Sequence, residues 1–309
     1  MEKKNFGSTG LKVTCLGLGL AEISRQERSG EVAEAGWVLN AALDGGINFL
    51  DTAACYGTTE ELIGATVAHR RNEYILATKC GHVTDDGAVG KPWTEHEEWT
   101  APAVEKSIER SLRRLRTDYL DLVQLHSCGV YVLERGEVIE ALVEAKRSGK
   151  TRFIGYSGDN EAARWAIDSG LFDTLQTSFN LVEQHARTKQ LFTLAKTKGM
   201  GIIIKRPIAN GAWGKDRSPY SYADEYFRRA RIMAQMGPLP GAPEDPILLA
   251  MGFVFAHPEI DTVIAGTHNP SHVRSNIELV EHRLPVPPET VAELHRRFDE
   301  VGEKWSQLT

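Results

Sequence analysis

Four residues with acid–base side chains stand at or just beyond the ends of short apolar segments. Asp51 and Tyr56 follow one segment, Lys79 the next and His126 a third. The three stretches read Asn48-Phe-Leu-Asp51-Thr-Ala-Ala-Cys-Tyr56-Gly57, Ile75-Leu-Ala-Thr-Lys79 and Asp121-Leu-Val-Gln-Leu-His126. If the segments are parallel strands, their carboxyl ends bring the four side chains to one edge. A phenol, an ammonium, a carboxylate and an imidazole there form a proton donor with a tunable pKa.

This set of groups suits the reduction of a carbonyl by a hydride. The oxygen gains negative charge during that step and must be protonated. A tyrosine is a poor acid unless a neighbouring cation stabilises its phenolate, so we expect Lys79 to lower the pKa of Tyr56 by about 1–3 units. Asp51 would keep Lys79 charged, and His126 would hydrogen-bond the carbonyl oxygen.

The elements that must position these residues alternate along the chain. Apolar residues at helical spacing follow Thr100, a predicted N-cap, and a second such pattern ends at Ser148-Gly149. Eight strands, each followed by a helical segment, favour a closed (β/α)8 TIM barrel formed by a single domain over residues 1–309. The predicted strands are 15–19, 47–50, 74–78, 120–125, 152–156, 173–177, 201–204 and 262–265.

Three stretches fall outside this repeat. Residues 3–14, centred on Gly7-Ser-Thr-Gly10, predict a β-hairpin that closes the lower end of the barrel. Residues 206–245, rich in glycine, proline and aromatic side chains, predict a long mouth loop that acts as a lid over the substrate. A second long loop, residues 81–100, contains His82, Trp93, His96 and Trp99.

Composition excludes several classes of protein. The net charge of −6 has no basic block, so nucleic acid is not an expected partner. The sequence has no apolar signal stretch and no run of membrane-spanning length, so a cytoplasmic location away from membranes is expected. Four cysteines without Cys-x-x-Cys spacing predict neither a disulfide framework nor a zinc site. His268 and His272 are four residues apart but lack a third ligand, so no metal is expected.

The three motifs around the acid–base residues resemble those of the aldo-keto reductase family. The opening Gly7-Ser-Thr-Gly10-Leu-Lys-Val-x-x-Leu-Gly17-Leu-Gly19 is similar to the start of that family, and order and spacing are kept throughout. The resemblance implies a barrel that binds a nicotinamide dinucleotide across its mouth. It makes Tyr56 the general acid, Lys79 and Asp51 the residues that tune it, and His126 the residue that positions the carbonyl.

The same resemblance implies the cofactor contacts of the nicotinamide. Ser157 and Gln176 match the positions that bind its carboxamide, whereas Gly158 replaces the family's usual Asn. Many members stack an aromatic ring on the nicotinamide after the seventh strand. This chain has Lys205-Arg206-Pro207 there, two cations that could meet the pyrophosphate.

The end of the eighth strand leads into a helix, and a helix N-terminus there is a natural phosphate site. The matching positions for the cofactor are Gly266, Thr267 and His272, with Asn276 at the adenine. Arg274 could reach a 2′-phosphate, so NADP(H) is favoured slightly and NAD(H) remains open.

The substrate is expected to be a small carbonyl compound or its alcohol. Glu22, just after the first strand, hints at a polar or hydroxylated substrate such as a sugar or polyol. Two alternatives remain open. One is a lyase that uses Lys79 as a Schiff-base amine. The other is a regulatory barrel that senses cofactor without turnover, similar to potassium-channel β-subunits. The sequence leaves the oligomeric state undetermined.

Overall fold

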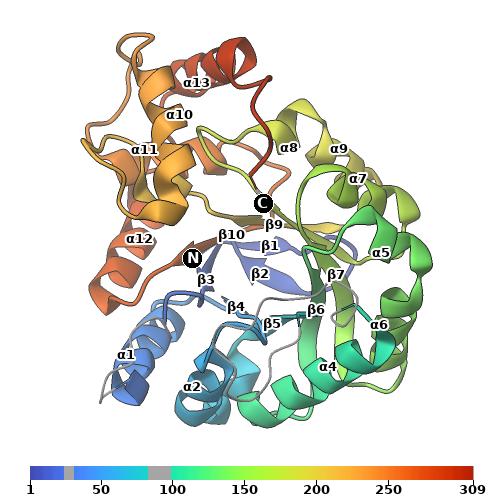
Figure 1. Cartoon of the computed structure of the whole chain (residues 1–309). Helices are drawn as coiled ribbons and strands as arrows, with labels where there is room; N and C mark the ends of the chain where they lie inside the picture. Colours follow the sequence, from blue (N-terminus) through green and yellow to red (C-terminus); the bar gives the residue numbers. More distant parts are fainter. Residues whose placement is uncertain (24–30, 83–98, 309) are drawn as a thin grey trace.

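Eight parallel strands close into a barrel in the order β10-β3-β4-β5-β6-β7-β8-β9 (Figure 1). The computed structural model describes residues 1–23, 31–82 and 99–308. All eight predicted strands form and the (β/α)8 barrel is confirmed, with strand ends within two residues of the predicted ones. The strands are β3 Leu16–Gly19, β4 Phe49–Asp51, β5 Ile75–Cys80, β6 Leu120–His126, β7 Thr151–Ser157, β8 Thr174–Ser178, β9 Gly201–Lys205 and β10 Thr262–Gly266.

Helices surround the barrel (Figure 1). The predicted N-cap is present, since the Thr100 hydroxyl accepts a hydrogen bond from Ala103 N at 3.4 Å. None of the helices in the described parts of the chain is long and apolar enough to cross a membrane. The helices are α1 Glu31–Asp44, α2 Thr59–Thr66, α4 Ala101–Leu115, α5 Val130–Arg135, α6 Glu137–Arg147, α7 Asn160–Ser169, α8 His185–Thr188, α9 Leu191–Thr197, α10 Asp224–Ala234, α11 Pro246–Phe255, α12 Pro270–His282 and α13 Pro288–Val301, with short 3-10 turns η1 Ala68–Glu73, η2 Ala209–Gly211 and η3 Ser221–Ala223.

The predicted N-terminal hairpin forms and closes the lower end of the barrel. Strand β1 (Lys3–Asn5) pairs antiparallel with β2 (Lys12–Thr14). Phe6, completely buried, packs edge-on against Phe49 of β4, with 5.7 Å between the ring centroids. Gly7 has φ +52°, and a Cβ there would lie 2.3 Å from Gly201 N, so only glycine lets the hairpin approach β9 this closely. Side chains of the hairpin and of the strands fill the lower end of the barrel, and the upper ends of the strands form its mouth.

The backbone around that upper mouth is unusual. Seven non-glycine residues in the described parts of the chain have positive φ. Five of the seven come just after β6, β7 or β9: Ser127, Asn160, Arg206, Ala209 and Asn210. Such conformations are unfavourable for residues with a Cβ and persist where surrounding contacts hold them. At the mouth, contacts with neighbouring residues therefore override the backbone's preference for negative φ.

Candidate active site

A cavity of about 510 Å³ opens at the upper ends of the strands. Of the four acid–base residues predicted from the sequence, Asp51, Tyr56 and His126 line it, while Lys79 lies behind them with a side chain that is only 2% exposed. Seven of the predicted cofactor residues also line the cavity, along with segments after β3 and β9. The predicted cofactor residues in the lining are Ser157, Gln176, Lys205, Arg206, Gly266, Thr267 and His272, the last of these on α12.

Lys79 and Asp51 form a buried ion pair directly beneath Tyr56. Lys79 Nζ lies 2.5 Å from Asp51 Oδ2 and also donates to Thr52 O at 2.9 Å. Burial alone would lower the pKa of Lys79, but the charges of Asp51 and Tyr56 raise it above its ordinary value. The side chain is therefore an ammonium at neutral pH, which makes it a poor amine nucleophile and disfavours Schiff-base chemistry.

Tyr56 presents its phenol to this ammonium. Lys79 Nζ lies 5.1 Å from the centroid of the Tyr56 ring. Burial raises the pKa of Tyr56 above 10, and the charge and hydrogen bond of Lys79 offset only part of that rise. The prediction that Lys79 lowers the pKa of Tyr56 below its ordinary value was wrong, because desolvation of the phenolate outweighs the attraction of the cation. The phenol is therefore fully protonated at neutral pH and available as an acid.

His126 lies beside Tyr56 at the end of β6. The two rings meet edge to face, with centroids 5.7 Å apart. Burial, and then the positive charge of Lys79, lower the pKa of His126 well below 6.5, so the imidazole is neutral. Its Nδ1 lies 3.3 Å from Cys55 Sγ. Burial also raises the pKa of Cys55 to about 11, so the thiol keeps its proton and can donate it to Nδ1, which leaves Nε2–H free to donate to a substrate oxygen.

Ser157 and Gln176 connect the predicted carboxamide position to Asp51. Ser157 Oγ donates to Gln176 Oε1 at 2.7 Å, and Gln176 Nε2 donates to Asp51 Oδ1 at 2.8 Å. Gln124 Nε2 adds a longer contact of 3.4 Å to the same carboxylate oxygen. Both oxygens of Asp51 are thus engaged, one by Lys79 and one by neutral amides.

Gly158, where the family usually has Asn, has no room for a side chain. A Cβ at this position would lie 2.5 Å from the hydroxyl of Tyr156, which donates to Cys128 O at 2.7 Å. The buried ring of Tyr156 therefore occupies the space that the side chain of an Asn at position 158 would need.

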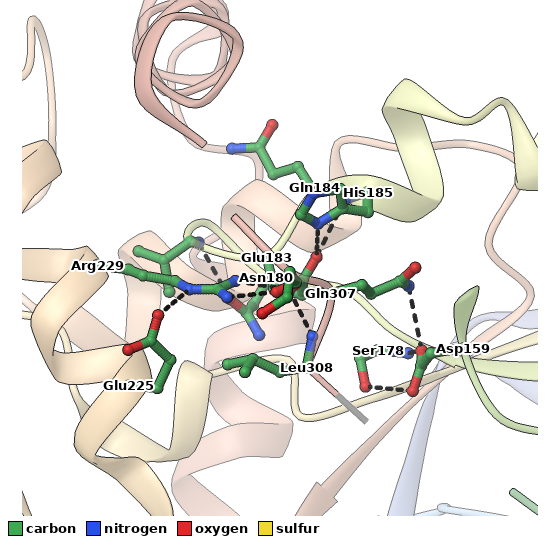
Figure 2. A network of polar contacts seen from close by, with 12 residues as sticks. Asp159, Ser178, Asn180, Glu183, Gln184, His185, Glu225, Arg229, Gln307 and Leu308 are labelled. Carbon is green, nitrogen blue, oxygen red and sulfur yellow. Dashed lines mark hydrogen bonds and ion pairs between the residues drawn. The ribbon is translucent and has the colours of Figure 1, made fainter. Parts of the chain in front are cut away.

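Lys205 and Arg206 stand at the end of β9, where relatives often have an aromatic ring. Lys205 Nζ pairs with Asp159 Oδ2 at 3.1 Å, and Asp159 also accepts hydrogen bonds from Ser178 (Figure 2). Burial, and then the neighbouring positive charge of Arg206, lower the pKa of Lys205, although Asp159 partly opposes this. Arg206 bonds the hydroxyl of Tyr222 in the loop after β9. The cavity thus has two cations on this side.

The β10 end contributes Gly266, Thr267 and His272 to the cavity, with Thr267 Oγ1 and His272 Nδ1 3.3 Å apart. The side chain of Asn269 caps α12 by accepting from Ser271 N at 2.9 Å, so one N–H of the first turn is already bonded. Arg274 and Asn276 lie further along α12 and are not part of the cavity lining. No group of three metal-ligating side chains occurs within residues 1–23, 31–82 and 99–308.

The loop after β9 both covers the cavity and packs against the barrel. Tyr220 and Tyr222 line the cavity, together with Asn210. Trp213 and Phe227 instead pack against the apolar core, and Tyr226 is buried. In the other loop, His82 lies over His126, with 5.0 Å between ring centroids, but Trp93 and His96 fall outside the described residues.

The donor set of this cavity fits a nicotinamide dinucleotide. Ser157 and Gln176 offer a hydroxyl and an amide for a carboxamide, and the two cations of β9 suit phosphate oxygens. The hydrogen-bonding capacity of the cavity and the excess of positive charge on its β9 side are consistent with an elongated anionic ligand.

Sequence reasoning missed two side chains that hold the predicted ones in place. Asp159, the partner of Lys205, comes two residues after β7 and obeys the rule that singled out the other polar residues at strand ends. Neither a motif nor a spacing indicates a role for Cys55, and no pattern in the sequence predicts its contact with His126.

The chain is similar to known proteins over nearly its whole length. The model of the Aldo/keto reductase family matches residues 15–296. L-Galactose dehydrogenase of Arabidopsis thaliana is 29% identical over 316 residues, with 97% of this chain and 95% of that protein covered. D-threo-aldose 1-dehydrogenase of a Pseudomonas species is 26% identical, with 90% and 92% covered. The solved holo form of aldo-keto reductase AKR11C1 from Bacillus halodurans superposes with a TM-score of 0.80 at 26% identity, with 96% of each chain covered.

Proposed function

The chain belongs to the aldo/keto reductase family and is an NAD(P)-dependent oxidoreductase, and from that premise we propose that it interconverts a polar, sugar-like aldehyde or ketone and its alcohol. The observation that carries the proposal is the arrangement of Tyr56, which lies in the cavity over a buried ammonium and beside a neutral imidazole.

The proposed roles follow from the chemistry of carbonyl reduction. A bound nicotinamide cofactor supplies the hydride that adds to the carbonyl carbon. As the C=O π electrons move to oxygen, Tyr56 gives its proton to that oxygen and becomes a phenolate. Lys79 stabilises the phenolate, and His126 Nε2–H donates to the same oxygen. In the direction of alcohol oxidation, the phenolate of Tyr56 takes the proton back.

The buried pair beneath Tyr56 supports this assignment. Asp51 holds Lys79 in one position and in one charge state, so the ammonium is already in place when negative charge develops above it. A donor fixed in advance needs no reorganisation during the reaction. This preorganisation makes Tyr56, with a raised pKa of its own, a usable acid.

The polarity of the cavity supports a hydroxylated substrate. Glu22, Asn210 and Tyr220 all contribute to the lining. Their side chains can donate or accept hydrogen bonds, and a site built to bond hydroxyl groups discriminates against ligands that lack them. L-Galactose dehydrogenase and D-threo-aldose 1-dehydrogenase are named for sugar substrates, which agrees with this choice.

For the cofactor we propose NADP(H). The cavity has Lys205 and Arg206 on one side, and Arg274 on α12, two residues beyond the lining residue His272, could reach a 2′-phosphate. Titration of the purified protein with NADPH, NADH, NADP⁺ and NAD⁺, monitored by tryptophan fluorescence, tests this directly. Tighter binding of the phosphorylated pair is expected. Equal or tighter binding of NAD(H) would overturn the choice of cofactor, and no binding by any of the four would overturn the proposed function.

Turnover with a panel of aldoses and of apolar aromatic aldehydes tests the substrate class. Aldoses are the expected substrates, and Glu22→Ala should raise their KM. Glu134→Ala on the exposed face of α5 is a matched control that should leave KM unchanged. A preference for apolar aldehydes that Glu22→Ala does not alter would contradict the proposed class.

A further inference from the structure

Gln307 and Leu308, the last described residues of the chain, lie in a polar network with Glu183 and Arg229 (Figure 2). Together with Ser306 they form a segment that reaches the cavity residue Arg206. Arg229 of α10, completely buried, donates to Ser306 O, and Leu308 N donates to Glu183 Oε2 at 3.1 Å. Glu183 is completely buried as well. The backbone of the segment is thus bonded to two buried, oppositely charged side chains.

The two charged residues are themselves firmly held. Arg229 Nη1 pairs with Glu183 Oε2 at 2.8 Å, and Arg229 Nε bonds Glu225 Oε1 at 2.9 Å. Glu183 Oε1 lies 2.5 Å from His185 Nδ1. A buried ion pair of this kind contributes little net stability but fixes geometry strongly, because a displaced partner leaves a desolvated charge. The network therefore specifies where Ser306–Leu308 must lie.

Gln307 contacts the end of β7. Its Oε1 accepts from Asn160 N at 3.0 Å, and its Nε2 donates to Asp159 Oδ1 at 3.4 Å. Asn160 has φ +60°, a left-handed conformation that costs energy in a residue with a side chain. Asp159 forms the ion pair with Lys205. One glutamine thus supports both the strained backbone after β7 and the carboxylate that positions a cavity cation.

Leu308 contacts the end of β9. Its carbonyl oxygen accepts from Arg206 Nη1 at 3.3 Å. Arg206 also has a left-handed backbone, with φ +59°, and its Nη1 lies 3.4 Å from Ser178 Oγ. Without the Leu308 carbonyl, the guanidinium would lose one of the acceptors that define its orientation.

We propose that Ser306–Leu308 is a positioning element that holds Lys205 and Arg206 in the mouth and thereby sets the affinity for the anionic part of the nicotinamide cofactor. This role rests on the proposed function. The segment contacts the cofactor side of the mouth through Asp159, Asn160 and Arg206, whereas Asp51, Tyr56 and Lys79 lie across the barrel. Its loss should therefore weaken cofactor binding and leave the chemical step largely intact.

The test compares the wild type with Gln307→Met, which keeps the volume of the side chain and removes both hydrogen bonds. We expect the dissociation constant of NADPH, measured by fluorescence, to rise about tenfold, or about 1.4 kcal/mol, because Asp159 and the backbone at Asn160 lose the contacts that position them. We expect kcat at saturating cofactor to change less than about twofold. A shortened chain that ends at Trp305 should lose more affinity, because Arg206 also loses the Leu308 carbonyl.

Asp299→Ala is the matched control for a purely structural effect. It removes the ion pair that joins α13 to Arg187 of α8, away from the cavity lining, and should lower the melting temperature without altering NADPH affinity. The positioning role is overturned if Gln307→Met binds NADPH as the wild type does, or if both variants lose affinity in proportion to their melting temperatures. Failure of the wild type to bind any nicotinamide cofactor would overturn the proposed function, and the positioning role with it.

Discussion

Two lysine–aspartate pairs lie at the mouth of the barrel in the described parts of the chain, and their properties differ. Lys79 and Asp51, at the ends of β5 and β4, lie 2.5 Å apart, with side chains 2% and 3% exposed. Lys205, at the end of β9, and Asp159, two residues after β7, lie 3.1 Å apart, and the Lys205 side chain is 14% exposed. The pKa of Lys79 is raised, whereas the pKa of Lys205 is lowered.

The partners of the two carboxylates explain this difference. Asp51 Oδ2 bonds Lys79, and its other oxygen has only the neutral amides of Gln176 and Gln124. Asp159 is already satisfied by Thr177, by the backbone N and hydroxyl of Ser178, and more weakly by Gln307. Burial lowers the pKa of Lys205 most, and the repulsion of Arg206 and Lys79 adds to this effect, which the longer contact with Asp159 does not fully offset.

The same pair of residue types therefore has two uses. The Lys79 ammonium must stabilise charge that appears during the reaction, and one oxygen of Asp51 bonds only this ammonium. Where a cation meets a ligand that brings its own negative charge, the carboxylate only positions the lysine. On this account the β4–β6 side of the mouth performs the chemistry, and the β7–β9 side binds the cofactor.

Replacing Lys79 is expected to have the largest effect. Lys79→Met removes the cation that stabilises the phenolate and leaves Asp51 buried with neutral partners. We expect kcat to fall by about 10²–10⁴-fold and the free energy of unfolding to fall by about 3–5 kcal/mol. Steady-state kinetics and urea denaturation measure the two effects. A variant with near-normal kcat would mean that Tyr56 does not depend on this ammonium.

Replacing Lys205 should instead affect binding. In Lys205→Met, Asp159 keeps its other hydrogen bonds, so the loss of stability should be below that of Lys79→Met by about 2 kcal/mol or more. We expect a rise of about tenfold in the dissociation constant of NADPH with kcat nearly unchanged. If Lys205→Met lowered kcat as much as Lys79→Met, the division of the mouth into two sides would be wrong.

The part of this picture that the sequence could predict is the part built from local signals. Each of the four acid–base residues lies at or just past a strand whose apolar run is recognisable, and the geometry of a parallel barrel brings those strand ends together. The pKa of Tyr56 could not be predicted, because desolvation depends on packing by the whole mouth. The contacts of Gln307 and Cys55 could not be predicted either, since each joins segments far apart in sequence without a repeated pattern.

A smaller effect concerns the pH dependence of cofactor binding. Burial lowers the pKa of Lys205, whereas the pKa of Lys79 is raised by Asp51 and Tyr56, so Lys205 loses its proton before Lys79 as pH rises. NADPH affinity should therefore fall by a few-fold, about the contribution of one charged hydrogen bond, as rising pH removes the proton of Lys205. Titrations across this range should give a flat profile for Lys205→Met. A wild-type profile as flat as that of the variant would argue against a charged Lys205 at the cofactor.

Single-turnover reduction of an aldose by the wild type and by Tyr56→Phe, each preloaded with NADPH, tests the central claim most directly. Burial keeps the pKa of Tyr56 above 10, so the wild-type rate should stay level between about pH 6 and about pH 9. Tyr56→Phe should lose about 10²–10⁴-fold in rate while its NADPH affinity remains that of the wild type. A Tyr56→Phe rate within about tenfold of the wild type would show that another group delivers the proton.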